Sequence, residues 1–178
     1  MNNELFFHDL ESERLLLKNI SYEDRDFIFK QFSDADVTKY LLDEEPCTTM
    51  QEADDIIDCY LIPEPRLQHR WILTLKSDNS KIGTCGFHCW NRENWSVEIG
   101  YDMQKEYWDK GYMTEALSAI ILFAKQDMQV KRIDAHIYPD NVRSSKLVKK
   151  LGFMNSADNV IYAFRGIDYI HNIYQLEI

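Results

Sequence analysis

Residues 95–116 read WSVEIGYDMQKEYWDKGYMTEA and predict a strand, a short loop and the beginning of a helix. The first nine residues alternate between two sets of side chains, which is typical of a β-strand with one buried face. One face would hold Trp95, Val97, Ile99, Tyr101 and Met103, and the other Ser96, Glu98, Gly100 and Asp102. Gly111 lies in the loop, and apolar residues at helical spacing predict a helix from about residue 114 to residue 127.

Strands and helices are expected on both sides of this stretch. Two β-rich segments before it are joined to it by polar turn sequences, which predicts an antiparallel meander. The expected strands lie at residues 13–18, 70–76, 81–90, 95–103 and 132–138, with two more within 160–178. The expected helices lie at residues 21–32, 48–61, 114–127 and 141–151. Ser21 would cap the first helix and Gly152 would close the last. This mixture predicts one α/β (α+β) domain over residues 1–178, built on a single mixed sheet.

The charge and hydropathy of the chain exclude several classes of protein. Its 178 residues include 30 acidic and 20 basic side chains, a formal net charge of −10, which makes an extended nucleic-acid interface a poor fit. Residues 119–124 form the longest apolar run, which is far too short to cross a membrane. No targeting segment is visible near Met1. We therefore expect a cytoplasmic protein that binds neither nucleic acid nor membrane.

The four cysteines, Cys47, Cys59, Cys85 and Cys89, are too sparse for a disulfide framework. The CGFHC sequence at residues 85–89 has the composition of a metal site, but it falls within an expected strand. Four residues of strand span about 13 Å, so the two thiols would lie too far apart to share a zinc ion. We expect no metal site and free thiols in the core.

Residues 107–116 (YWDKGYMTEA) join the end of a strand to the start of a helix. Backbone N–H groups at such a junction lack partners and the helix dipole adds positive potential, so a pyrophosphate can bind there without a basic side chain. Gly111 would let the ligand approach the backbone. Taken alone, the segment is more simply explained as an ordinary turn, and it carries neither a dinucleotide-binding nor a P-loop motif.

Together with its surroundings, this segment resembles the GNAT superfamily of N-acetyltransferases, and within it the branch of ribosomal-protein N-terminal acetyltransferases (RimJ/RimL-like). The motifs that carry the resemblance are ERLLLK at 13–18, DVTKYL at 36–41, VEIGY at 97–101, WDKGYMTEA at 108–116, and NVRS to KLGF at 141–153. The resemblance implies an acetyl-CoA-dependent N-acetyltransferase without a metal. It also implies a mostly antiparallel sheet of about six to seven strands, flanked by about four helices and splayed between the fourth and fifth strands.

The resemblance implies how acetyl-CoA is held. The pyrophosphate would accept hydrogen bonds from five consecutive backbone amides, those of Lys110, Gly111, Tyr112, Met113 and Thr114. Met113 stands where the family has a small residue. The backbone of Met103 would pair with the pantetheine arm, and Asn141 would hydrogen-bond the same arm. The alternatives are that Met103 is a core side chain and that Asn141 caps the helix that follows it.

Glu98 is the candidate general base. An amine with a pKa near ~10.4 is mostly protonated at neutral pH, so it cannot attack a thioester until a carboxylate, through water, takes its proton. By resemblance, Ser144 lies near the thioester sulfur, with helix capping as its alternative role. Val148 stands where many family members have a tyrosine acid, so the thiolate would leave with help from Ser144 or water. His88 and His136 are possible replacements for Glu98.

The expected acceptor is a primary amine, either a protein N-terminus or a small cation such as a polyamine or an aminoglycoside. Residues 34–58 carry nine acids against one base, Lys39, and by resemblance they border the acceptor entrance. The alternative function is a catalytically silent acyl-CoA-binding regulatory module on the same fold. Either a monomer or a homodimer is compatible with the sequence.

Overall fold

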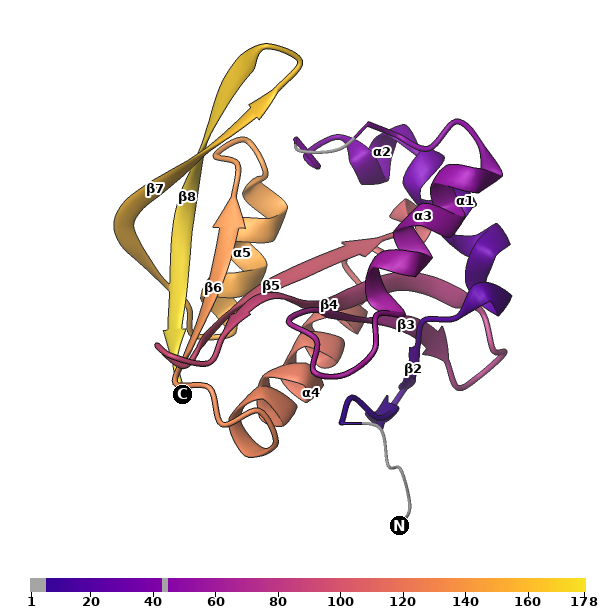
Figure 1. The fold of residues 1–178 in the computed structure, drawn as a ribbon, viewed down its shortest axis with the longest axis horizontal. Helices are drawn as coiled ribbons and strands as arrows, with labels where there is room; N and C mark the ends of the chain where they lie inside the picture. Colours follow the sequence, from indigo (N-terminus) through magenta and orange to yellow (C-terminus); the bar gives the residue numbers. More distant parts are fainter. Residues whose placement is uncertain (1–5, 43–44) are drawn as a thin grey trace.

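The computed structural model describes residues 6–42 and 45–178, and within them eight strands form one sheet in the order β1-β2-β3-β4-β5-β6-β8-β7 (Figure 1). The strands are β1 Leu10–Glu11, β2 Leu15–Asn19, β3 His69–Leu75, β4 Lys81–Asn91, β5 Ser96–Met103, β6 Arg132–Ile137, β7 Met154–Phe164 and β8 Ile167–Glu177. The α-helices of the described residues are α1 Arg25–Ser33, α2 Ala35–Thr38, α3 Met50–Tyr60, α4 Tyr112–Gln126 and α5 Val142–Lys150. Two short 3-10 helices are η1 Tyr22–Asp24 and η2 Lys105–Tyr107. The predicted mixed α/β fold is confirmed, with slightly more strands and helices than expected.

The predicted meander is formed by β3, β4 and β5, which pair antiparallel in that order. β2 pairs antiparallel with the other edge of β3, where Leu15 and Leu17 are fully buried. Two short elements, β1 and α2, were not expected. β1 has two residues, and α2 has four residues capped by the Asp34 side chain, so neither is long enough to show a hydrophobic period.

The sheet opens between β5 and β6, the fourth and fifth of the strands expected from the sequence (Figure 1). The two strands are parallel and pair through residues Ser96–Glu98 of β5 and Arg132–Asp134 of β6. Beyond these three positions, the described residues of the two strands do not pair with each other. The expected splay is therefore present.

The opening leaves backbone groups of β5 without a sheet partner on one side. The amide of Gln104 donates to the carbonyl of Ile82 in β4 at 3.0 Å, which fixes the alternation of the preceding residues. The backbone groups of Ile99, Tyr101 and Met103 therefore point toward the side that β6 has left. Such groups can hydrogen-bond an extended ligand in the manner of an added strand.

Helices cover both faces of the sheet and bury two cores. On one face, α4 and α5 pack over a core that includes Ile99, Leu117 and Val148. On the other face, α1 and α3 bury Ile28 and Ile57 completely. The side chains of β5 therefore divide between two environments, as the alternation predicted, and the strand carries residues to both sides of the opening.

Two expectations about strand limits were wrong. Trp95 does not lie on the buried face, because its φ of 57° places it in the turn before β5, where 42% of its surface is exposed. β7 begins at Met154 rather than near residue 160. Its register shifts between Asn155 and Asn159, and Ala157 has a φ of 68°, so an irregular segment hides the start of the strand from pattern analysis.

All four cysteines are free thiols, but only Cys47 and Cys85 lie in the core. Cys59 and Cys89 are exposed, so the expectation of core thiols was wrong for them. Cys89 has a φ of 51° at an irregularity of β4, which turns its side chain away from the regular strand face. Within residues 6–42 and 45–178, no three His, Cys, Asp or Glu side chains are grouped to hold a metal ion, and no helix is long and apolar enough to cross a membrane.

Candidate active site

A cavity of about 740 Å³ lies at the opening between β5 and β6. Its lining comes from both faces of the sheet. Glu98 and Asp102 belong to the face covered by α1 and α3, whereas Tyr101 and Ser144 belong to the side of α4 and α5. The cavity therefore crosses the sheet, which allows two ligands to meet from opposite sides.

Glu98 is the last residue of β5 that pairs with β6. Its side chain is 31% exposed and lines the cavity, and its Oε2 lies 3.4 Å from Nδ1 of His136. The same nitrogen is 2.7 Å from the hydroxyl of Tyr162 in β7. Cys89 hydrogen-bonds the carboxylate, and partial burial together with Glu98 raises the pKa of this thiol. The structure thus places the predicted base beside His136, one of its possible replacements.

His88, the other possible replacement, belongs to a polar network at the cavity floor. Arg70 Nη1 donates to Asp102 at 2.7 Å and to Thr84 at 2.6 Å, and Gln31 donates to the second Asp102 oxygen at 2.7 Å. His88 Nε2 lies 3.3 Å from Arg70 Nη2, and burial together with this guanidinium lowers the pKa of His88 to about 3. His88 is therefore neutral at physiological pH, and its role as a replacement for Glu98 stays a prediction.

Ser144 and Asn141 line the cavity at the start of α5. Asn141 Oδ1 accepts a hydrogen bond from the Ser144 amide at 3.2 Å, which confirms the capping alternative for Asn141. Ser144 Oγ lies 2.7 Å from the hydroxyl of Tyr101 in β5. Val148, one turn further along the helix, is fully buried. Contact of Asn141 with a pantetheine arm stays a prediction.

The expected pyrophosphate site consists of the loop before α4 and the first turn of that helix. α4 begins at Tyr112 rather than at Thr114, so three of the five candidate amides belong to the helix. Gly111 is the N-cap with a φ of 81°, a left-handed conformation that glycine adopts without strain. The Glu115 amide donates to the Gly111 carbonyl at 3.1 Å, and the amides before it have no intrahelical partner. These donors, beside a residue without a side chain, fit a pyrophosphate.

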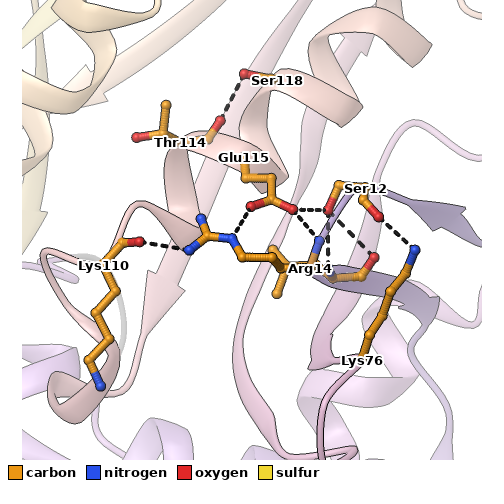
Figure 2. Close-up of polar contacts among 8 residues, drawn as sticks. Ser12, Arg14, Lys76, Lys110, Thr114, Glu115 and Ser118 are labelled. Atoms are coloured by element: carbon orange, nitrogen blue, oxygen red, sulfur yellow. Dashed lines mark hydrogen bonds and ion pairs between the residues drawn. The ribbon is translucent and has the colours of Figure 1, made fainter.

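Arg14 and Glu115 fasten this loop to the sheet, as Figure 2 shows. Arg14 donates to Glu115 from Nε at 2.7 Å and from its backbone amide at 2.6 Å. Ser12 Oγ donates to the same carboxylate at 2.6 Å, and Arg14 Nη1 donates to the Lys110 carbonyl at 3.1 Å. The guanidinium also lies 4.4 Å from the ring centre of Tyr112. Burial by itself would raise the pKa of Glu115, but the donors of Ser12 and Arg14 hold it below its usual value.

Helix α5 supports the same loop from the other side. Arg143 pairs with Asp109 at 2.5 Å, and its guanidinium lies 4.3 Å from the ring centre of Trp108. Trp108 Nε1 in turn donates to the Met103 carbonyl at 2.7 Å. The Met103 side chain is buried, which confirms that it is a core residue, while the pairing of its backbone with a pantetheine arm stays a prediction. Contacts from the turn before β2 and from α5 thus fix the position of the loop.

The acidic stretch at residues 34–58 contributes less to the cavity than expected. Of its described acids, Glu45, Glu52 and Asp55 line the cavity. The others lie outside the lining, several of them in ion pairs or helix caps. Asp43 and Glu44 lie outside the described residues. The charge that faces the cavity is therefore carried by a few side chains rather than by the whole stretch.

Sequence patterns missed three parts of this site. They are the ion pair of Arg14 and Glu115 that holds the loop before α4, called the clamp below, the Arg70–Asp102 ion pair and the Tyr101–Ser144 hydrogen bond. A signal existed for the second, because Arg70 and Asp102 are charged residues within strands whose neighbours are mostly apolar. Charges in such positions indicate a buried ion pair. The other two join segments far apart in the chain, and no local pattern marks them.

The site thus combines an opened sheet, the N-terminus of a helix beside the opening and a carboxylate within it. Residues 14–154 match the acetyltransferase (GNAT) domain, and the chain belongs to this family. The Uncharacterized N-acetyltransferase p20 of Bacillus licheniformis is 35% identical over 147 residues, 81% of each chain. The Uncharacterized N-acetyltransferase YoaA of Bacillus subtilis (strain 168) is 29% identical over 172 residues, 96% of this chain and 97% of that protein. An acetyltransferase (GNAT family) from Bacillus anthracis has a TM-score of 0.82 at 22% identity, covering 95% of this chain and 98% of its own.

The chain is therefore an N-acetyltransferase that uses acetyl-CoA as its cosubstrate. The alternative of a silent regulatory module finds no support in these relatives. The ribosomal branch is not confirmed, because the [Ribosomal protein uS5]-alanine N-acetyltransferase of Escherichia coli (strain K12) matches 31% of this chain. A spermidine N-acetyltransferase from Vibrio cholerae, solved with CoA and spermine, shares the fold at a TM-score of 0.77 and 16% identity, covering 93% of this chain and 95% of its own.

Proposed function

We propose that the chain transfers the acetyl group of acetyl-CoA to a primary amine of a small, multiply charged cation of the polyamine type. The charge of the cavity carries this proposal. Glu52, Asp55 and Glu98 line the cavity, and in the described part of the chain none of them pairs with a lysine or arginine. The one Lys or Arg among the described lining residues, Arg70, is already bonded to Asp102. The carboxylates attract a cation and orient it.

Two of these carboxylates lie three residues apart on α3, which places them on the same side of that helix. The amides of Thr48 and Thr49 donate to Glu52 at 2.6 and 2.9 Å and lower its pKa, so it stays charged. Glu52 and Asp55 can hold one ammonium group of the acceptor while another nitrogen lies at Glu98. An acceptor with two or more amines fits this separation of charges better than a monoamine.

The size of the acceptor is limited by a contact beside the cavity. Glu45, which lines the cavity, forms an ion pair with Arg165 in the turn between β7 and β8. The contact joins the segment before α3 to the far hairpin, on the opposite side of the sheet opening. This ion pair narrows the access to the cavity, which favours a small acceptor over the N-terminus of a folded protein. Peptides with flexible N-termini are therefore included in the amine panel below.

The residues divide the chemistry between the two sides of the opening. Glu98 takes one proton of the attacking ammonium through water, and the free amine forms the new N–C bond. The C–S bond then breaks with its electron pair on sulfur, and the second nitrogen proton leaves to solvent water. Amides of β5 at the opening polarise the acetyl carbonyl. The amides of Lys110 to Thr114 hold the pyrophosphate, and Ser144 faces the departing sulfur. Holding both reactants in one cavity supplies much of the rate.

A panel of amines tests the acceptor. The protein is incubated with acetyl-CoA and with spermidine, putrescine, an aminoglycoside or peptides of ribosomal-protein N-termini, while thiol release and product mass are measured. We expect acetylated polyamine and thiol release in equal amounts. Acetylated ribosomal peptides without any acetylated small cation would overturn the proposed acceptor.

A variant of Asp55 tests whether the carboxylates of the cavity bind the cationic acceptor. Asp55→Asn should raise the KM for a diamine about two- to fivefold, the effect of losing one exposed ion pair, with kcat nearly unchanged. The KM for a monoamine should change less, because its single nitrogen lies at Glu98. Glu93→Gln, which removes an exposed acid outside the cavity lining, is the matched control. Equal KM values in the two variants would contradict the role of Asp55.

A further inference from the structure

His88 lies between the proposed base and the buried ion pair at the floor of the cavity. It is directly opposite Glu98 across β4 and β5, so the two side chains share the face covered by α1 and α3, with Cβ atoms about 4.5–5.5 Å apart. Gly100 follows Glu98 on this face of β5. A Cβ atom at Gly100 would lie 2.9 Å from His88 Nε2, so the missing side chain leaves room for the histidine ring to reach Arg70.

Arg70 fixes which ring nitrogen of His88 carries the hydrogen. Its Nη2 lies 3.3 Å from His88 Nε2, and a guanidinium donates hydrogen bonds but accepts none. Nε2 is therefore the acceptor, and the hydrogen of the neutral ring is on Nδ1. Arg70 cannot turn away, because its other terminal nitrogen, Nη1, donates to Asp102 at 2.7 Å and to Thr84 at 2.6 Å.

The Nδ1–H group of His88 has no hydrogen-bond acceptor among the described residues. In the imidazole ring, Nδ1 is opposite the Nε2–Cδ2 edge, and this edge lies against Gly100. Nδ1 is therefore turned away from β5, and His88 lines the cavity. Glu98 forms its ion-pair contact with His136 instead of His88. One water molecule can bridge the remaining gap between His88 and Glu98.

The buried ion pair has a role that apolar residues could not take over. The side chains of Arg70 and Asp102 are 10% and 4% exposed. Removing two charges from water costs free energy, and an apolar pair of similar volume often stabilises a core at least as well. An apolar pair, however, would provide no donor to His88 Nε2. The ion pair is thus explained by the orientation that it gives to His88.

We propose that His88 positions the water molecule through which Glu98 takes a proton of the acceptor, by donating a hydrogen bond from Nδ1 to that water. This inference rests on the proposed function. The water accepts one proton from the ammonium and gives one of its own to Glu98, and the free amine then attacks the thioester. His88 gains and loses no proton, so it is a positioning residue, and Arg70 sets its orientation. Neither ring nitrogen has a free lone pair in this arrangement, so His88 assists Glu98 rather than replacing it.

NMR of the wild-type protein, with histidine labelled with ¹⁵N, tests the tautomer without turnover. Couplings between the ring nitrogens and the carbon-bound ring hydrogens distinguish the Nδ1–H form from the Nε2–H form. The spectrum of His88→Gln assigns the signal of His88. We expect a neutral His88 with its hydrogen on Nδ1, and an Nε2–H form would overturn the inference.

Two variants of His88 separate a role in the reaction from a role in the fold. In His88→Gln, the side-chain oxygen can replace Nε2 and accept from Arg70, but no donor remains at the place of Nδ1. In His88→Asn, the amide nitrogen replaces Nδ1 as the donor, and the bond to Arg70 is lost. With spermidine and acetyl-CoA, kcat should fall about three- to tenfold in His88→Gln, the effect of losing one hydrogen bond, and about twofold in His88→Asn. The KM for acetyl-CoA should stay nearly unchanged in both.

Urea unfolding of the same two variants should give the opposite order. His88→Asn should unfold at a lower urea concentration than His88→Gln, because only the glutamine keeps the bond to the buried Arg70. A purely structural role predicts the same order for kcat and stability. A kcat of His88→Gln equal to or above that of His88→Asn would therefore overturn the inference, while acetylation of spermidine leaves the proposed function intact. If the wild type does not acetylate spermidine, the proposed acceptor is wrong, and the two variants are compared with the amine that the panel identifies. Absence of turnover on every amine would overturn both.

Discussion

Glu115→Gln tests whether the clamp at the start of α4 supports the pyrophosphate site. The glutamine oxygen can replace Oε1 and keep the donors of Ser12 and the Arg14 amide. Its NH₂ group then faces Arg14 Nε, which donates to Oε2 at 2.7 Å in the wild type. One charge-assisted bond is lost, worth about 1.5–3 kcal/mol when buried. Because the Arg14 side chain is 43% exposed, we expect a loss of about 1–2 kcal/mol in the free energy of unfolding.

Urea unfolding, thermal unfolding and calorimetric titration with acetyl-CoA measure the effect. The variant should lose about 3–6 °C in Tm, and its dissociation constant for acetyl-CoA should rise about fivefold as the loop amides lose their fixed position. Glu106→Gln, an exposed acid in η2 just before the loop, is the control. Equal stability and equal affinity in the two variants would refute the clamp as a support of this site.

The pH dependence of stability in the same variant tests the direction of the pKa shift of Glu115. The pKa of Glu115 is lower in the folded protein than in the unfolded chain, so its carboxylate stabilises the fold above the unfolded value near ~4.3. This contribution is lost as pH falls through the folded pKa. The difference in stability between wild type and Glu115→Gln should therefore be full at neutral pH and shrink below about pH 4. A difference that grows on acidification would contradict the assignment.

Three further predictions concern the loop, the base and the buried histidines. Gly111→Val, at a φ of 81°, should weaken acetyl-CoA binding at least about tenfold by calorimetry. Gly166→Val, at a φ of 73° with open space around it, carries a similar strain and should leave binding unchanged, and equal effects would remove the loop from the site. Glu98→Gln should lower kcat about 10²- to 10⁴-fold with little change in acetyl-CoA affinity, and full activity across the pH range would exclude it as the base. Burial lowers the pKa of His69 to about 2 and that of His88 to about 3, and nearby arginines add to the effect. Because the unfolded chain takes up these protons below about pH 6.5, stability should fall on acidification by up to about 1.4 kcal/mol per pH unit for each histidine, and a flat urea-unfolding profile between pH 7.5 and 5.5 would contradict this.

Local sequence patterns predicted most of the elements, because a cap or an alternating strand depends on a few neighbouring residues. Ser21 and Thr49 each form a capping box, and Gly152 ends α5 with a φ of 94°. The period of two in β5 is enough by itself to place Glu98 and Tyr101 on opposite faces of the strand. The same period wrongly assigned Trp95 to the strand, because this residue continues the apolar pattern but lies in the preceding turn with a left-handed backbone conformation.

Local sequence patterns could not predict contacts between residues that are far apart in the chain. Arg14 and Glu115 are 101 residues apart, and Tyr101 and Ser144 are 43 apart, so their contacts depend on how α4 and α5 pack against the sheet. The opening of the sheet was expected through resemblance alone. An alternating strand such as β6 looks the same whether its neighbour pairs with it along three residues or along its whole length.

The most direct test of the account is a crystal structure of the protein with acetyl-CoA bound. We expect the diphosphate to accept hydrogen bonds from the amides of residues 110–114, and the acetyl carbon to lie in the opening between Glu98 and Ser144. A diphosphate bound elsewhere, with the first turn of α4 free of ligand, would contradict the account.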